Sequence, residues 1–293
     1  MDGGREESHM RIVWFIGLNP MLSLYFNAGI ITNKIISPLK IITLHEGSYS
    51  VDISKKFIPF NPAVHQAKDR PASLFIHVQP FLIKTADRLI VLDAGLGYKN
   101  DEGELIIHKN IRDAGFDPHD VNLVLMSHLH FDHAGGVVFE RDGQLEPTFP
   151  NADYVIQRGE WETAFSRSSA SYKTALFDVL QRHNCVHFVE GSGCLNQHIS
   201  YELTGGHCEF HQVFLIQDGN EIAFFGGDIL PEPEQLLRKL IAKYDFDGRK
   251  AMELREAYGK RAAASGWTCL FYHAKSNAIG KVGFEGNAFQ ILS

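Results

Sequence analysis

Three histidines and one aspartate lie within six residues of this chain, at His128, His130, Asp132 and His133. Imidazole nitrogen and carboxylate oxygen are ligands that Zn²⁺ and similar Lewis-acidic ions prefer. The apolar run 122–126 precedes the cluster and two glycines follow it, which predicts a buried strand that ends in a loop. Residues two apart on an extended chain share a face, so His128 and His130 can face one ion while Asp132 and His133 reach a neighbouring point. The cluster predicts a metal site with room for two adjacent ions.

Four other segments place a candidate ligand, or a partner for a ligand, at the end of an apolar run or a glycine turn. Asp93 ends one such run and can accept a hydrogen bond from a ligating imidazole. His207 follows a Thr-Gly-Gly turn and is a fifth candidate ligand, whereas His211 is expected to line the site. Asp228 follows two glycines and could bridge two cations, and His273 ends a run late in the chain.

Together these residues resemble the metallo-β-lactamase superfamily of hydrolases, whose pattern is a strand-end Asp, H-x-H-x-D-H, a later Gly-His, a Gly-Asp and a final His. The order and spacing fit from about Leu39 to the C-terminus. The resemblance implies an α/β fold, the αββα four-layer sandwich, as one catalytic domain over 39–293. It also implies two divalent ions, expected to be Zn²⁺, with the following ligands: His128, His130 and His207 at the first ion, Asp132, His133 and His273 at the second, and Asp228 shared. Asp132 and Asp228 are the expected catalytic carboxylates.

The metal pair implied by this resemblance favours hydrolysis. Metal coordination lowers the pKa of water from about 16 to about 7, so a hydroxide that bridges the ions can attack near neutral pH. The layout is most similar to the N-acyl homoserine lactonases and methyl-parathion-hydrolase-like enzymes, which implies an ester, lactone or phosphotriester with an apolar substituent. The lactonases place a tyrosine three residues after the bridging aspartate, whereas this chain has Pro231. That difference weakens the lactonase assignment and leaves hydrolysis in place.

Three alternatives remain open. A thioester hydrolase of the glyoxalase II type is expected to show a basic patch near the C-terminus, where this chain offers Lys275 and Lys281. An iron-dependent redox protein on the same fold is the second, and its flavodiiron form would need a carboxylate in place of His130. The third is a metal-stabilised binding module without catalytic activity.

Composition limits the partners. The formal net charge of −7 over 293 residues, with no cluster of Lys and Arg, argues against a nucleic-acid partner and favours a small-molecule substrate. A homodimer is compatible with the sequence. The four cysteines lack C-x-x-C spacing, and Cys208 is expected to be a small buried side chain beside His207. A disulfide between Cys185 and Cys194 stays open, because it depends on the redox compartment.

Local patterns predict the regular elements. Strands are expected at 73–78, 89–92, 123–126, 154–157, 213–216 and 222–225, and helices at 106–114, 171–183, 232–243 and 248–264. Several aromatic side chains are candidates to line an apolar substrate pocket, namely Tyr49, Phe57, Phe60, Phe131, Phe165, Tyr172 and Phe210.

Residues 1–38 are expected to form an N-terminal extension or a leader-like segment. Residues 12–33 carry no charged side chain, but Pro20 and several Asn and Gly residues disfavour a spanning helix. The sequence therefore disfavours membrane association of 12–33 but leaves it open, and we expect a cytoplasmic protein, with export or a periplasmic location as the alternative if residues 10–31 act as a leader.

Overall fold

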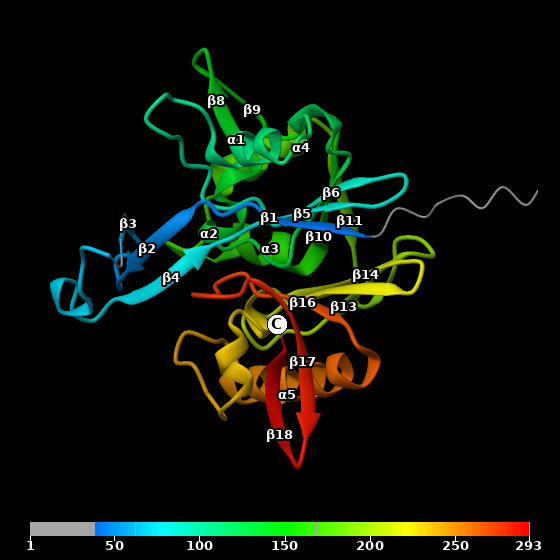
Figure 1. The fold of residues 1–293 in the computed structure, drawn as a ribbon. Coiled ribbons are helices and arrows are strands. Elements are labelled where there is room, and N and C mark those ends of the chain that lie inside the picture. Colours follow the sequence, from blue (N-terminus) through cyan, green and yellow to red (C-terminus); the bar gives the residue numbers. More distant parts are fainter. Residues whose placement is uncertain (1–38, 62, 168, 293) are drawn as a thin grey trace, which may run out of the picture. The chain divides into compact units, whose positions relative to one another are not determined.

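Two β-sheets packed face to face carry the candidate ligands (Figure 1). The computed structural model describes residues 39–61, 63–167 and 169–292, which belong to one compact unit. The expectations for residues 1–38 lie outside the described residues. Within the described ranges, none of the helices has the length and apolar character needed to cross a bilayer.

The first sheet has six strands in the order β1-β5-β6-β7-β10-β11. Strands β1, β5 and β6 pair antiparallel, and β6, β7, β10 and β11 pair parallel. The strand bounds are β1 (Lys40–Thr43), β5 (Phe81–Lys84), β6 (Leu89–Leu92), β7 (Leu123–Leu125), β10 (Asp153–Gln157) and β11 (Val186–Val189).

The second sheet has seven strands in the order β12 to β18. Strands β15 and β16 pair parallel, and the other neighbours pair antiparallel. The strand bounds are β12 (Gly193–Cys194), β13 (Ile199–Leu203), β14 (Gln212–Asp218), β15 (Glu221–Phe225), β16 (Thr268–Leu270), β17 (Ile279–Glu285) and β18 (Ala288–Leu292).

Two smaller β-structures accompany these sheets. A three-stranded sheet has the order β3 (Phe57–Pro59), β2 (Gly47–Val51), β4 (Leu74–Val78), and a hairpin joins β8 (Val138–Arg141) to β9 (Gln144–Pro147). The α-helices are α1 (Ile106–Asp113), α2 (Phe131–Ala134), α3 (Arg158–Ser166), α4 (Thr174–Arg182) and α5 (Gly248–Ser265).

Successive side chains in the strands of the first sheet pack on opposite faces of that sheet, and this alternation produces the layers. In β6, Ile90 and Leu92 join an apolar cluster with the second sheet and α5, whereas Leu89 and Val91 join a cluster with α1, α3 and α4. Successive side chains of a strand point to opposite faces, so the first sheet is buried on both sides. Figure 1 shows α5 on the far side of the second sheet, where it packs against β17. The predicted αββα sandwich is confirmed.

The expected strands are all present, and β6 has the predicted bounds. The helices expected at 106–114, 171–183 and 248–264 appear as α1, α4 and α5, and α3 was not predicted. The prediction of a helix at 232–243 is wrong, because only a 3-10 turn at Pro233–Leu236 forms there. The backbone after this turn forms hydrogen bonds with distant residues instead of helical ones. The Arg255 guanidinium donates to the Leu240 carbonyl, and the Phe246 N–H donates to the His207 carbonyl.

Candidate metal centre

Several of the polar side chains of the site meet because they follow neighbouring parallel strands. Asp93 follows β6 and His128 follows β7, and these two strands are parallel neighbours in the first sheet. Asp228 follows β15 and His273 follows β16, which are parallel neighbours in the second sheet. Parallel neighbours present their carboxyl ends at the same edge, so each sheet gathers its polar side chains at one edge.

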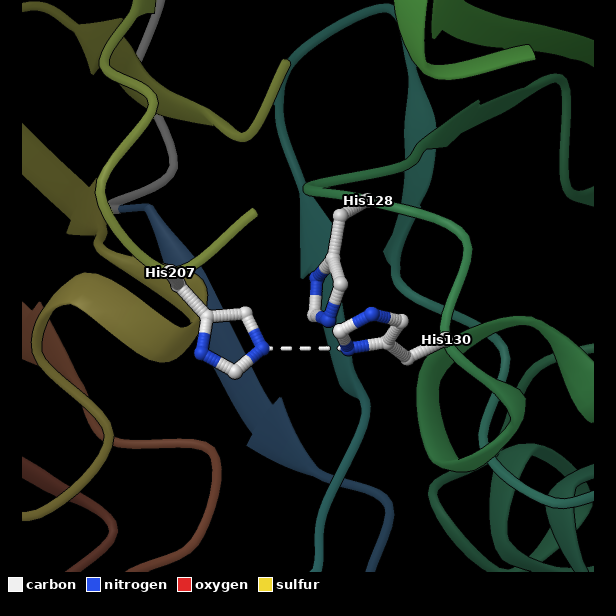
Figure 2. A group of neighbouring side chains, drawn as sticks. All are labelled: His128, His130 and His207. Carbon is white, nitrogen blue, oxygen red and sulfur yellow. Dashed lines mark hydrogen bonds between the residues drawn. The ribbon is translucent and has the colours of Figure 1, made fainter. Parts of the chain in front are cut away.

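His128, His130 and His207 form the first cluster, which we call the three-histidine group. Figure 2 shows the three rings pointing toward one another, with His207 arriving from the loop between β13 and β14. His130 Nδ1 lies 3.1 Å from His207 Nε2, and one nitrogen from each ring lies within 4.8 Å of the others. This group could hold one metal ion.

Asp132, His133 and His273 form the second cluster, which we call the aspartate–histidine group. The short helix α2 carries Asp132 and His133, so the chain turns directly after His130 and these side chains face a different point. Asp132 Oδ2 lies 3.6 Å from His273 Nε2 and 3.8 Å from His133 Nε2. This group could hold a second metal ion.

Asp228 lies between the two groups. Its Oδ2 is 3.2 Å from His207 Nε2, whereas its Oδ1 is 3.2 Å from both His133 Nε2 and His273 Nε2. One carboxylate oxygen therefore faces each group. This is the position expected of a carboxylate shared by two cations.

Unsatisfied polar atoms test whether the centre fits metal ions. Within the described part of the chain, the buried atoms His128 Nε2, His133 Nε2 and Asp228 Oδ1 make no well-aligned hydrogen bond, although the last two lie 3.2 Å apart. A buried polar atom without a partner costs about 1–3 kcal/mol, so three of them at one point need a compensating interaction. Nitrogen and carboxylate donors at this spacing fit divalent cations of the zinc type.

The electrostatics around His128 and His130 favour neutral rings. Burial, followed by the neighbouring imidazoles, holds the pKa values of His128 and His130 well below their usual range. A metal ion binds the neutral imidazole, so these rings carry free lone pairs at neutral pH. Burial disfavours the charged carboxylate of Asp228, but the adjacent histidines outweigh it and hold its pKa well below the usual value.

Hydrogen bonds behind the ligands orient them. Asp93 Oδ2 accepts a 2.6 Å hydrogen bond from His133 Nδ1, as predicted for this aspartate, and its carboxylate also accepts from Ser127. Such a partner fixes which ring nitrogen is free for a metal ion. Asp245 Oδ1 lies 2.9 Å from His207 Nδ1 and has the same role. Sequence reasoning missed Asp245, because the segment that contains it showed no motif.

His211 and Cys208 lie beside the ligands and are engaged elsewhere. His211 Nε2 accepts the N–H of Asp228 at 3.1 Å, and His211 Nδ1 lies 2.9 Å from the Thr204 hydroxyl. His211 therefore lies beside the ligands, with its ring centroid 5.2 Å from that of His128, but it is fully buried and does not line the cleft. The buried Cys208 thiol donates to Glu160 at 3.3 Å. Cys185 and Cys194, for which the sequence left a disulfide open, are both free thiols.

A cleft of about 840 Å³ opens above the two groups. Its walls include exposed apolar side chains, among them Leu74, Ile241 and Phe246, which are 49%, 54% and 61% exposed. The aromatic residues expected to line it are confirmed for Phe57, Phe131 and Tyr172. Four others lie outside the lining, namely Tyr49, Phe60, Phe165 and Phe210. Phe165 instead packs on Trp161 and Phe177, and the Phe210 ring lies against Gly159.

Basic side chains also reach this cleft. They are Lys55, Arg167, Lys243 and Lys275. Arg167 pairs with Glu209 and Lys275 pairs with Glu232, so part of this charge is neutralised within the protein. The cleft therefore combines an apolar mouth with mixed charge.

The layers and the site together define an αββα protein with a candidate two-metal centre between its sheets. Residues 75–273 match the family model of the metallo-β-lactamase superfamily. The chain belongs to this superfamily.

Relatives and solved structures point in the same direction. The N-acyl homoserine lactonase AttM of Agrobacterium fabrum is 31% identical over 148 residues, which is 47% of each chain. The N-acyl homoserine lactonase AiiA of Bacillus thuringiensis subsp. kurstaki is 26% identical over 156 residues, which is 47% of this chain and 57% of that protein. The chain thus spans about half the length of the curated relatives it matches.

Two solved structures share the fold over most of this chain. A probable metal-dependent hydrolase from Staphylococcus aureus has a TM-score of 0.70 and 23% identity, and covers 88% of this chain and 97% of its own. AidC, a dizinc quorum-quenching lactonase in complex with N-hexanoyl-L-homoserine as product, has a TM-score of 0.68 and 24% identity, and covers 88% and 95%.

Proposed function

We propose that this protein is a hydrolase that uses two divalent metal ions, Zn²⁺ by the chemistry of the donors, to open an ester-type bond in a small molecule with an apolar substituent. The three-histidine group would hold one ion, the aspartate–histidine group the other, and Asp228 would bridge them. The observation that carries this proposal is the placement of the Asp228 carboxylate, with one oxygen 3.2 Å from His207 and the other 3.2 Å from His133 and His273.

The bound ions would supply Lewis acidity and bring the pKa of a water molecule to about 7. In the reaction, the oxygen of water adds to the carbonyl carbon and the bond to the alkoxy oxygen breaks. The Asp132 side chain is 15% exposed and lines the cleft, so its carboxylate can receive the proton and pass it to the departing alkoxide.

The cleft supports the substrate class. A lactone or ester with an alkyl or aryl group would place that group against Leu74, Ile241 and Phe246, and burying exposed apolar surface contributes roughly 25 cal/mol per Å². The lactonase relatives favour a lactone among ester-type substrates. Pro231 stands where the lactonases have a tyrosine, but Tyr244 lines this cleft with its ring centroid 6.0 Å from that of His207. We propose that the Tyr244 phenol donates to the substrate carbonyl oxygen.

A substrate panel tests this function. Zinc-loaded protein is assayed with acyl lactones of increasing chain length, aryl esters, phosphotriesters and thioesters, and the bound metal is counted by elemental analysis. We expect about two zinc ions per chain and the largest kcat/KM on lactones or esters with longer apolar chains. Preference for thioesters, or one iron ion per chain, would replace the proposal with the corresponding alternative.

A further inference from the structure

Glu160 is a buried carboxylate directly behind the three-histidine group. It lies on α3 and is 1% exposed. Its Oε1 accepts the N–H of Leu129 at 3.1 Å and the hydroxyl of Tyr172 at 3.0 Å. Its Oε2 accepts the thiol of Cys208 at 3.3 Å. All three donors adjoin a candidate ligand: Leu129 lies between His128 and His130, Cys208 follows His207, and the Tyr172 ring centroid lies 5.2 Å from that of His130.

Glu46 is a second buried carboxylate, and it supports the other group. It is 5% exposed and precedes β2. Its two oxygens accept the N–H groups of Leu96 at 2.5 Å and Tyr98 at 2.7 Å, in the loop that follows Asp93. The loop in turn holds α2: the Ala94 N–H donates to the His133 carbonyl at 2.7 Å.

The loop after Asp93 is also in close contact with the backbone that follows α2. The N–H of Gly136 donates to the Gly95 carbonyl at 2.9 Å, and a Cβ on Gly97 would lie 2.8 Å from the Gly136 Cα. A displacement of the loop therefore moves the backbone that carries Asp132 and His133. Glu46 reaches the aspartate–histidine group through this contact.

We propose that Glu160 and Glu46 are positioning residues, each for one half of the metal centre: Glu160 for the three-histidine group and Glu46 for the aspartate–histidine group. The inference rests on the proposed function, because it assigns roles toward the ions proposed there. Neither carboxylate belongs to the candidate ligands. Glu160 accepts donors that adjoin the ligands, whereas Glu46 accepts donors in the loop that contacts α2.

Removal of either carboxylate should have a local effect. The buried donors of one group would lose their acceptor and move to find another, while the hydrogen bonds behind the other group would stay intact. Partners of metal ligands typically change metal affinity about 10- to 100-fold when they are lost. The two variants are therefore expected to weaken different ions.

Zinc affinity in two single-site backgrounds tests the proposal with the full chain. His273→Ala leaves the three-histidine group and Asp228, and His207→Ala leaves the aspartate–histidine group and Asp228. Glu160→Leu and Glu46→Leu are placed in each background, and zinc release to a chromophoric chelator gives the dissociation constant. The matched control is Glu202→Gln, which alters a carboxylate bound to Tyr258 and Arg261 away from the centre.

The expected result is a crossed pattern. Glu160→Leu weakens zinc binding about 10- to 100-fold in the His273→Ala background and less than about threefold in the other, and Glu46→Leu does the reverse. Glu160→Gln and Glu46→Gln keep one acceptor oxygen, so they should bind zinc more tightly than the corresponding leucine variants and less tightly than the parent background. If a leucine variant fails to fold by circular dichroism, the glutamine variants give the same pattern with smaller changes.

Equal weakening in both backgrounds, or none, would overturn the proposal, since a carboxylate with a merely structural role would not distinguish the two ions. Failure of the proposed function gives a different result. In that case, the wild-type protein and both parent backgrounds bind no zinc before Glu160 or Glu46 is changed.

Discussion

Asp228 is the side chain on which both halves of the centre depend. Asp228→Ala removes the oxygens that face His207, His133 and His273, and His128→Ala removes a buried ring of the three-histidine group. We expect each variant to lose at least about 10²-fold in kcat/KM, corresponding to about 2.7 kcal/mol of transition-state stabilisation, and to bind less zinc.

The fold of these variants should persist, because apolar packing holds the sheets. Activity, metal content and circular dichroism check the three expectations together. His183→Ala changes an exposed histidine at the end of α4 and should leave all three unchanged. Full turnover in both site variants would contradict the proposed mechanism.

Tyr244 provides a test at the cleft wall. Burial, followed by the nearby carboxylates, raises the pKa of this phenol to about 12, so it keeps its proton and can donate a hydrogen bond at neutral pH. Tyr244→Phe should lower kcat about 10- to 100-fold with a small change in KM, since a donor to a developing oxyanion acts mainly in the transition state. Steady-state kinetics on a lactone check this, with Tyr201→Phe on β13 as control; an unchanged kcat would remove Tyr244 from the mechanism.

The candidate ligands were predictable from sequence, and their supporting residues were not. His128, His130, Asp132 and His133 are adjacent in the chain, so composition alone marks them. Asp245 and Glu160 reach the site from segments without a motif, and their role depends on packing between distant elements. A buried glutamate in an unpredicted helix carries no signal in one sequence.

The contact between α2 and the loop after β6 requires glycine. A Cβ on Gly136 would lie 2.1 Å from the Ala94 carbonyl oxygen, which is backbone and cannot rotate away. Gly136→Ala should destabilise the protein by about 1–3 kcal/mol or more and weaken zinc binding by displacing α2. Gly283→Ala in β17 is the matched control, because its Cβ would meet side chains at 3.6–3.8 Å. Urea unfolding of both variants measures the difference, and equal stability would contradict the argument.

Elements with strong periodicity were predicted, and elements set by tertiary contacts were not. Strands β6 and β7 are apolar runs that only a buried sheet accommodates. Residues 232–243 have a helical pattern, yet no long helix forms there. The Arg255 guanidinium binds the Leu240 carbonyl, and the His207 carbonyl binds the N–H of Phe246 just beyond the segment. Those tertiary hydrogen bonds outweigh the local propensity, which is a weak preference.

Stability of the whole molecule should depend on pH through Glu46. Burial raises its pKa from 4.5 to about 7. Between these values the unfolded chain releases the proton while the folded chain keeps it, so the free energy of unfolding falls as the pH rises. The shift corresponds to about 3 kcal/mol, fully lost above about pH 7.

This dependence is measured as the difference in unfolding free energy between wild type and Glu46→Gln in metal-free protein from pH 4 to 8. As the pH rises from about 4.5 to 7, the unfolding free energy of wild type should fall relative to that of Glu46→Gln. Glu202 provides a control of opposite sign, because hydrogen bonds from Arg261 lower its pKa, so its stabilising contribution is lost on acidification. A flat profile for Glu46→Gln relative to wild type would contradict the prediction.

Removal of metal should separate activity from folding. Two apolar clusters hold the layers, and neither includes a candidate ligand. Dialysis against a chelator is therefore expected to abolish hydrolysis and lower the Tm while the circular dichroism spectrum is retained, and added zinc should restore turnover. Loss of secondary structure on chelation would show that the ions are needed for folding itself.

The two sheets contribute to the centre from opposite sides. His128, His130, Asp132 and His133 follow a strand of the first sheet, while His207, Asp228 and His273 lie in segments that follow strands of the second. A slide of one sheet against the other by an ångström would therefore change every distance between the two sets at once. Side chains deep in the inter-sheet core, such as Phe81 and Phe225, whose ring centroids lie 6.0 Å apart, therefore set the spacing of the candidate ligands. On the proposed function, a substitution there that barely alters the melting temperature would still change the distances within the metal centre.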